Sequence, residues 1–139
     1  ACTAEFKNLE FFYFHNCLYE GVWKDNRRRF SERTPTWDIL HKYGHDYKVI
    51  FVGDASMSPY EVSHPGGSVE HFNEESGATW LERVRHVYPA TVWLNPTPER
   101  QWDYSQSTKL IHELMGGSMY PLTLDGLDDA MRELTRKKH

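Results

Sequence analysis

Residues 47–54, with the sequence YKVIFVGD, are the stretch that decides the fold. A run of β-branched and aromatic residues of this length predicts a buried β-strand over residues 47–52, which Gly53 ends. Asp54 follows directly, so its carboxylate is expected at the rim of a sheet. In open α/β sheets, ligands collect beyond the carboxyl ends of the strands. Asp54 is therefore the first candidate for a functional residue.

Four other segments have strand character, the last two more weakly: residues 9–15, 90–94, 19–23 and 119–124. The first is aromatic throughout, and a tight turn near Asn16 is expected to follow it. Asn95-Pro96 ends the second, because proline cannot donate to the strand ladder. Pro121 within the fourth argues for an edge position in the sheet.

Helical patterns lie between these strands, at residues 36–43, 74–87, 105–115 and 125–136. The second carries an apolar stripe formed by Trp80, Leu81, Val84 and Val87. Gly116-Gly117 follows the third as a stop signal. Strands alternating with helices predict crossover connections, a mostly parallel sheet and helices on both faces. We therefore expect one doubly wound α/β domain over residues 1–139.

Two further stretches are expected to be less regular. The first six residues have the pattern of the last turn of a helix. Residues 56–73 contain two prolines and two adjacent glycines, which predicts a long irregular loop. A loop of this length in a compact domain is often functional.

Composition excludes several classes of partner. The net charge is only −4 with charged residues at 26%, so neither nucleic acid nor an anionic membrane is expected as a partner. Residues 27–29 are all arginine, which indicates a solvated loop in preference to a phosphate-binding patch. No run of 18 apolar residues and no signal-peptide pattern is present, so the cytoplasm is the expected compartment. Cys2 and Cys17 are expected to be reduced and buried, because two cysteines make no disulfide framework.

The position of Asp54 is compatible with three roles. Its carboxylate can coordinate a hard cation, accept a hydrogen bond from a loop, or cap the next segment. Position alone favours capping. Thr34 and Thr36 precede a predicted helix, so either could be its N-cap. A threonine hydroxyl and the Asp54 carboxylate on neighbouring loops would also be suitable oxygen ligands for Mg²⁺.

Five segments together resemble the von Willebrand factor A-type domains of the bacterial CoxE-like family. They are FFYFHNCLYEGVWKD (11–25), TPTWDILHKYG (34–44), YKVIFVGDASMSPYE (47–61), VWLNPTPERQWDY (92–104) and MYPLTLDGLDDAMREL (119–134). The resemblance implies a metal-ion-dependent adhesion site built from three loops. Thr34 matches the second loop, with Thr36 as an alternative register, and Asp54 matches the third.

The resemblance also implies a function. Such a domain binds Mg²⁺, with Mn²⁺ or Ca²⁺ as alternatives, and leaves one coordination position for an acidic group of a partner protein. CoxE-like proteins act beside MoxR-type AAA+ ATPases in maturing metalloenzymes, so that ATPase or its client enzyme is the expected partner. A binding module is expected, not an enzyme. The expected partner-binding rim consists of His15, Asn16, Ser56, Asn95 and Thr97.

The sequence departs from the family in its first metal loop, because no Asp-x-Ser-x-Ser motif is present. Residues 54–58, Asp-Ala-Ser-Met-Ser, follow the wrong strand to supply it. We therefore expect the first strand and its loop to lie upstream of Ala1. Loss of a central strand exposes two sheet edges, so self-association of this chain is also expected. With only two protein ligands, the chain alone should bind Mg²⁺ weakly or not at all.

Two alternatives involve catalysis or another metal. His64 and His71 lie in the 56–73 loop beside several glutamates, which suggests a zinc site, but their spacing is not that of an HExxH motif. A metal-dependent α/β hydrolase is the alternative function. It lacks support from a GxSxG elbow or a phosphate-binding loop, because the sequence contains neither. Residues 95–102 are either a binding rim or a rigid connection with Trp102 packed on the end of the sheet.

Overall fold

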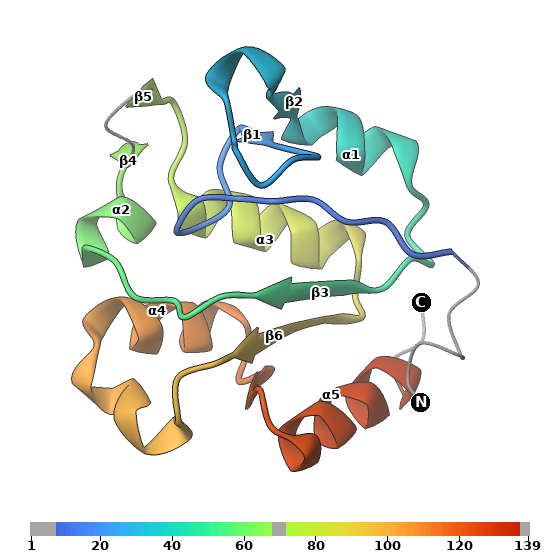
Figure 1. The fold of residues 1–139 in the computed structure, drawn as a ribbon, viewed down its shortest axis with the longest axis vertical. Coiled ribbons are helices and arrows are strands. Elements are labelled where there is room, and N and C mark those ends of the chain that lie inside the picture. Colours follow the sequence, from blue (N-terminus) through green and yellow to red (C-terminus); the bar gives the residue numbers. More distant parts are fainter. Residues whose placement is uncertain (1–7, 68–71, 137–139) are drawn as a thin grey trace.

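The computed structural model describes residues 8–67 and 72–136 (Figure 1). Its main sheet has three parallel strands in the order β3-β6-β7: β3 (Val49–Val52), β6 (Thr91–Asn95) and β7 (Met119–Pro121). Phe51 is paired with Trp93, and Trp93 with Met119. The predicted parallel sheet is confirmed, as is the edge position of Pro121.

Helices cover both faces of this sheet. Phe51, Trp93 and Met119 share one core with residues of α3 (Gly77–Val87) and α4 (Gln106–Leu114). Ala90 and the alternate β6 residues Val92 and Leu94 form a second core with Ala130 and Leu134 of α5 (Leu124–Arg136). Because successive side chains of a strand point to opposite faces, the two cores lie on opposite sides of β6. The chain is thus a mixed α/β fold.

Serine caps fix where α3 and α4 begin. The Ser76 hydroxyl accepts a hydrogen bond from the Thr79 backbone N–H at 3.2 Å. Ser105 does the same for Thr108 at 3.3 Å. The predicted start of the first of these helices at residue 74 is wrong by three residues, because the cap determines the first turn. The glycine stop signal is confirmed: Gly116 and Gly117 both have positive φ after α4.

The N-terminal half contains short elements, which lie above β3 in the view of Figure 1. β1 (Gly21–Val22) pairs antiparallel with β2 (Thr34–Pro35), and a 3-10 turn, η2 (Phe30–Glu32), lies between them. α1 (Thr36–Lys42) follows β2 directly. A second 3-10 segment, η3 (Glu99–Tyr104), connects β6 to α4.

The described part of the stretch predicted as an irregular loop, residues 56–67 and 72–73, is more ordered than expected. It contains α2 (Pro59–Ser63) and the antiparallel pair β4 (Gly66–Gly67) and β5 (Phe72–Asn73). Proline at the first turn of a helix is favourable, since its missing N–H has no helical partner there. The prediction of a long structureless loop was therefore wrong.

Residues 9–15 are extended but do not belong to the main sheet. Their exposure alternates as in a strand, with Phe12 and Phe14 half-buried and Phe11 and Tyr13 exposed. Isolated bridges join Tyr13 to Trp23 and His15 to Cys17. The predicted strand is thus wrong as a sheet member. Alternation fixes which side chains face the core, whereas a ladder also needs a neighbouring strand.

Three other expectations concern the cysteines, the first helix and the membrane. Cys17 is free and completely buried, as predicted. The helical turn expected over residues 1–6 and the residue Cys2 lie outside the described residues. Within residues 8–67 and 72–136, every helix is too short or too polar to cross a membrane.

Candidate functional site

Asp54 lies at the carboxyl end of β3, exposed to solvent. Its Oδ1 accepts a hydrogen bond from the Ser56 backbone N–H at 3.0 Å. This bond to the residue two positions on is an Asx turn, and it supports Ala55, whose φ is +58°. Asp54 therefore has the local capping role that its position favoured, while the rest of its carboxylate faces solvent.

The buried side chain of Asn95 attaches this turn to the neighbouring strand. Its Nδ2 donates to the Asp54 carbonyl oxygen at 3.1 Å, and its Oδ1 accepts from the Thr97 N–H at 2.9 Å. Asn95 is fully buried at the end of β6. Four predicted site residues, Asp54, Ser56, Asn95 and Thr97, are thus connected by hydrogen bonds at one edge of the sheet. We name these four residues the Asp54 rim.

Two hydroxyls of α4 hold the same loop from the other side. The Ala55 carbonyl oxygen accepts hydrogen bonds from Ser107 Oγ at 2.7 Å and from Thr108 Oγ1 at 3.1 Å. Ser107 Oγ in turn accepts from the Met57 N–H at 2.9 Å. Sequence reasoning missed both residues. Their signal was two small hydroxyl residues in the first turn of a helix whose next turn carries Leu110 and Ile111.

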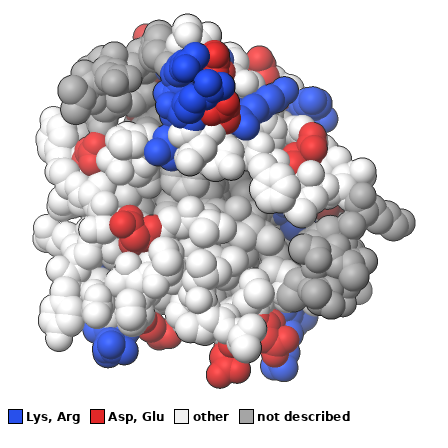
Figure 2. Space-filling view, viewed as in Figure 1, with Lys and Arg blue, Asp and Glu red and all other residues white. Residues whose placement is uncertain are grey.

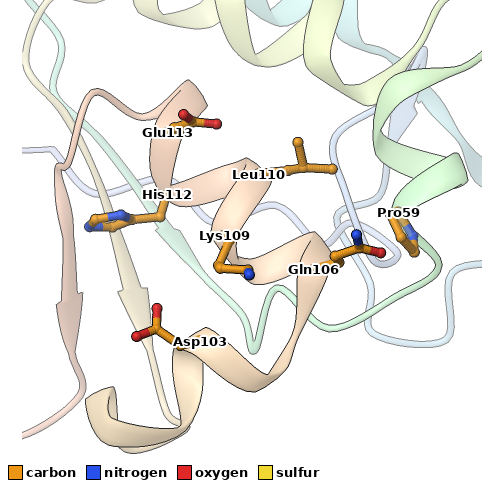
Figure 3. A pocket seen from close by; sticks show the side chains of 7 residues that line it. All are labelled: Pro59, Asp103, Gln106, Lys109, Leu110, His112 and Glu113. Carbon is orange, nitrogen blue, oxygen red and sulfur yellow. The ribbon is translucent and has the colours of Figure 1, made fainter.

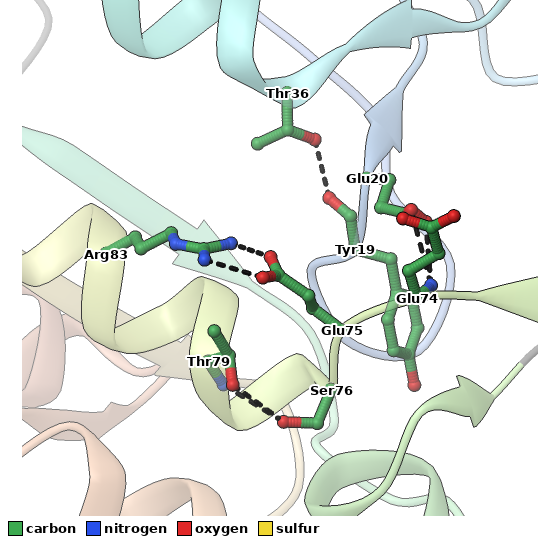
Figure 4. Close-up of polar contacts among 8 residues, drawn as sticks. All are labelled: Tyr19, Glu20, Thr36, Glu74, Glu75, Ser76, Thr79 and Arg83. Atoms are coloured by element: carbon green, nitrogen blue, oxygen red, sulfur yellow. Dashed lines mark hydrogen bonds and ion pairs between the residues drawn. The ribbon is translucent and has the colours of Figure 1, made fainter.

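The two candidate threonines lie in a different part of the fold. Thr34 belongs to β2, and the buried Thr36 hydroxyl donates to the Tyr19 carbonyl oxygen at 2.5 Å (Figure 4). Pro35 occupies the N-cap position of α1, so the prediction of a threonine cap was wrong. The hydrogen bonds of Thr36 lead to the N-terminal segment, whereas those of Asp54 lead to Ser56 and to Asn95 of β6.

The polar side chains near Thr36 have structural roles, because they connect the N-terminal segment to α3. The Glu20 carboxylate accepts from the Glu74 N–H at 2.9 Å, just before the Ser76 cap of α3 (Figure 4). Arg83 forms an ion pair with Glu75, and its guanidinium lies over the Trp37 and Trp80 rings. These contacts fasten the N-terminal segment and α1 to α3.

Of the remaining rim candidates, Asn16 contacts α2 and His15 precedes it in the chain. Asn16 has a φ of +63°, and its Nδ2 lies 3.3 and 3.4 Å from the carboxylate oxygens of Glu61. The Tyr19 hydroxyl donates to the Glu61 carbonyl oxygen at 2.9 Å. His15 is exposed beside them. The predicted rim therefore divides into the Asp54 rim and a separate pair beside α2.

The residues around Asp54 supply a single carboxylate to a metal. Among residues 8–67 and 72–136, no three histidine, cysteine, aspartate or glutamate side chains are grouped closely enough to hold a metal ion. The suggested zinc ligand His71 lies outside the described residues. Mg²⁺ favours near-octahedral oxygen coordination and keeps several waters. Asp54 fits as one ligand of such an ion, but the described residues do not provide a complete site.

We therefore expect the chain alone to bind Mg²⁺ only weakly, because one carboxylate must compete with water. Calorimetric titration with MgCl₂ should give a Kd of about 1 mM or weaker, which corresponds to about 4 kcal/mol of binding free energy or less. The Asp54→Asn variant should remove the residual heat. A Kd in the low micromolar range would contradict this prediction and indicate further ligands.

Neither the Cys17 thiol nor the hollow between α2, η3 and α4 has the features of an active site. Burial raises the pKa of the Cys17 thiol to about 12, so it stays protonated at neutral pH. A hollow of about 520 Å³ lies between α2, η3 and α4 (Figure 3). Its charged side chains Asp103, Lys109 and Glu113 are exposed, so it is an open depression. In residues 95–102, the buried Trp102 donates its Nε1–H to the Thr97 carbonyl oxygen at 2.8 Å, which favours a packed connection, and the alternative of a binding rim stays a prediction.

Comparison with known proteins identifies no relative. No family model, no curated protein and no solved structure matches the chain. The resemblance to CoxE-like proteins therefore stays a prediction. What the chain can do has to be argued from the Asp54 rim and the surfaces beside it.

Proposed function

We propose that this chain is a metal-ion-assisted protein-binding module of the von Willebrand factor A type, similar to the CoxE-like proteins. Its partner would be a MoxR-type AAA+ ATPase or the metalloenzyme that such an ATPase matures. The observation that carries the proposal is the Asp54 rim. An exposed carboxylate is held there by buried neighbours at the carboxyl end of a parallel sheet, where α/β domains bind ligands.

Preorganisation supports a binding role for this carboxylate. The loop that carries Asp54 is fixed by the Asn95 side chain and by the hydroxyls of Ser107 and Thr108. Among the described residues, the Ser56 N–H donates to one Asp54 carboxylate oxygen and the other oxygen accepts no hydrogen bond. Binding to a fixed loop loses little conformational entropy, so more of the interaction energy contributes to affinity.

Asp54 is the one carboxylate that the Asp54 rim offers to a metal ion in this proposal. Asp54 would hold Mg²⁺ together with water, and an acidic side chain of the partner would complete the coordination. We infer that affinity for the ion comes mainly from the assembled complex. Partner capture should therefore depend on Mg²⁺ even though the chain alone binds the ion weakly.

The test is capture of a purified MoxR-type AAA+ ATPase on the immobilised chain, with MgCl₂ or with EDTA. Capture is expected only with MgCl₂, and Asp54→Ala should lower it about tenfold, the effect of losing one charge-assisted contact of about 1.4 kcal/mol. Asp129→Ala removes an equally exposed carboxylate from α5 and should leave capture unchanged.

Two results would overturn the proposal. One is capture that persists unchanged in EDTA or in the Asp54→Ala variant. The other is turnover of a chromogenic ester or phosphate substrate by the wild-type chain that Asp54→Ala abolishes, which would indicate the hydrolase. Circular dichroism of each variant checks that the fold is intact, as expected for an exposed side chain.

A further inference from the structure

The hollow between α2, η3 and α4 has walls that the core holds in place. On the inner face of α4, Ile111 is buried and the Ser107 hydroxyl donates to the Ala55 carbonyl oxygen at 2.7 Å. Trp102 anchors η3 and Val62 anchors α2, since both side chains are buried in the same core. A ligand that enters between fixed walls causes little loss of conformational entropy, so more of the interaction energy contributes to affinity.

Charged side chains without partners line one part of this hollow. Asp103 comes from η3, whereas Lys109 and Glu113 lie one turn apart on α4 (Figure 3). In the part of the chain that the structure describes, none of these three side chains forms a hydrogen bond or an ion pair. Two carboxylates and one ammonium leave a net charge of −1, with His112 beside them neutral at pH 7. The charge of the hollow therefore favours a cation.

The other part of the hollow is apolar. Leu110 of α4 and Pro59 of α2 line it, and both are half-buried. In the view of Figure 3, the Leu110 side chain points toward Pro59, whereas Asp103 lies on the opposite side of α4. Long cationic side chains pack their aliphatic stem on apolar surface and keep the charged end in water. An apolar wall beside unpaired carboxylates fits a side chain of this kind.

The openness of the hollow favours a polypeptide over a small molecule. A small-molecule pocket buries about 70–90% of its ligand, whereas this hollow of about 520 Å³ is bounded by the exposed side chains of Asp103, Lys109 and Glu113. A side chain that projects from a larger partner is covered on its outer side by the partner itself. In the view of Figure 2, the largest group of Lys and Arg side chains lies over the segment between β1 and β2, away from α2 and α4. That group therefore does not oppose a cationic partner at the hollow.

We propose that this hollow binds an arginine side chain of a partner polypeptide. The aliphatic stem packs on Leu110 and Pro59, and the guanidinium pairs with the Asp103 or the Glu113 carboxylate. Arginine fits better than lysine, because its planar guanidinium binds a carboxylate through two parallel hydrogen bonds and is more weakly hydrated. The Lys109 ammonium opposes the incoming charge and limits the affinity. This site does not include the Asp54 carboxylate and does not rest on the function proposed above.

The test is a titration of the full chain with a capped pentapeptide that has arginine at its centre, flanked by leucines and then glycines. Amide chemical shifts in NMR spectra follow the binding, and saturable shifts are expected over residues 103–113. A matched peptide carries citrulline, which has the shape of arginine without its charge. It should bind about threefold more weakly, the effect of one exposed charge pair. Equal binding of the two peptides would overturn the proposal, as would no binding of either.

Variants of the hollow should change the affinity in opposite directions. Asp103→Asn and Glu113→Gln each remove a carboxylate and should weaken binding of the arginine peptide about threefold, whereas Lys109→Gln removes the opposing ammonium and should strengthen it about threefold. Because all three side chains are exposed, circular dichroism should be unchanged. Asp54→Ala should bind like the wild type.

Three results with these variants would contradict the proposal. One is weaker binding by Lys109→Gln, since the hollow would then hold an anionic group. Another is binding that none of the three substitutions in the hollow changes. The third is a loss of binding in Asp54→Ala, which would place the peptide at the Asp54 rim.

Discussion

Replacing Trp93 by alanine is expected to lower the free energy of unfolding by about 4 kcal/mol, the usual cost of truncating a large core aromatic residue. Trp93 is fully buried in β6, the middle strand. Its ring stacks on Phe51 at 5.1 Å and meets Phe14 edge-on at 5.8 Å. Urea denaturation followed by circular dichroism would measure the loss. A loss of about 4 kcal/mol is a large fraction of the free energy of unfolding of an ordinary domain.

A matched pair of substitutions separates the packing of Trp93 from its hydrogen bond. The Trp93 indole N–H donates to the Gly53 carbonyl oxygen at 2.8 Å. The Trp80 indole N–H is buried without a hydrogen-bond partner among the described residues. Trp93→Phe should therefore cost about 1 kcal/mol more than Trp80→Phe, the net worth of one hydrogen bond. A larger loss of unfolding free energy for Trp80→Phe than for Trp93→Phe would contradict this prediction.

The sequence predicted the positions of the sheet strands well, because residues 49–52 and 92–94 are continuous apolar runs followed by clear stop signals. β6 is buried throughout, whereas β3 is not the buried strand that was predicted, because only Phe51 is buried and Val52 is 52% exposed. A continuous apolar run indicates a strand that is buried on both sides, which occurs in parallel sheets covered by helices. The ends of α4 were equally predictable, since Ser105 and the glycines after Met115 are local signals. Local chemistry is sufficient for elements of this kind.

The features that the sequence did not predict depend on contacts between residues far apart in the chain. The Thr36 hydroxyl donates a hydrogen bond to the Tyr19 carbonyl oxygen and not to a residue of the Asp54 rim. This pairing is a tertiary contact. The attachment of Ala55 by Ser107 links residues 52 positions apart. Likewise, the aromatic alternation of residues 9–15 predicts an extended chain but not its neighbour. None of these pairings has a signature in the local sequence.

The second large effect is expected at Asn95, where Asn95→Leu should lower the free energy of unfolding by about 3 kcal/mol. Leucine has a similar volume, but the substitution leaves the Asp54 carbonyl oxygen and the Thr97 N–H without their partner at the end of the sheet. Each polar group left unsatisfied in a buried place costs about 1–3 kcal/mol. Thr97→Ala is the control, because only the Thr97 backbone N–H is used, and it should change stability by less than about 0.5 kcal/mol.

Hydrogen exchange would show whether Asn95 acts on the Asp54 rim itself. The Thr97 amide should exchange faster in Asn95→Leu, because its acceptor is gone, whereas amides of α5 should change only with global stability. Faster exchange should extend to Ser56 and Met57 if Asn95 holds the whole turn in place. Unchanged exchange at these amides, in a variant that is destabilised as a whole, would mean that Ser107 and Thr108 alone fix the loop. The rigidity that we assign to the Asp54 carboxylate would then come from α4 and not from the sheet.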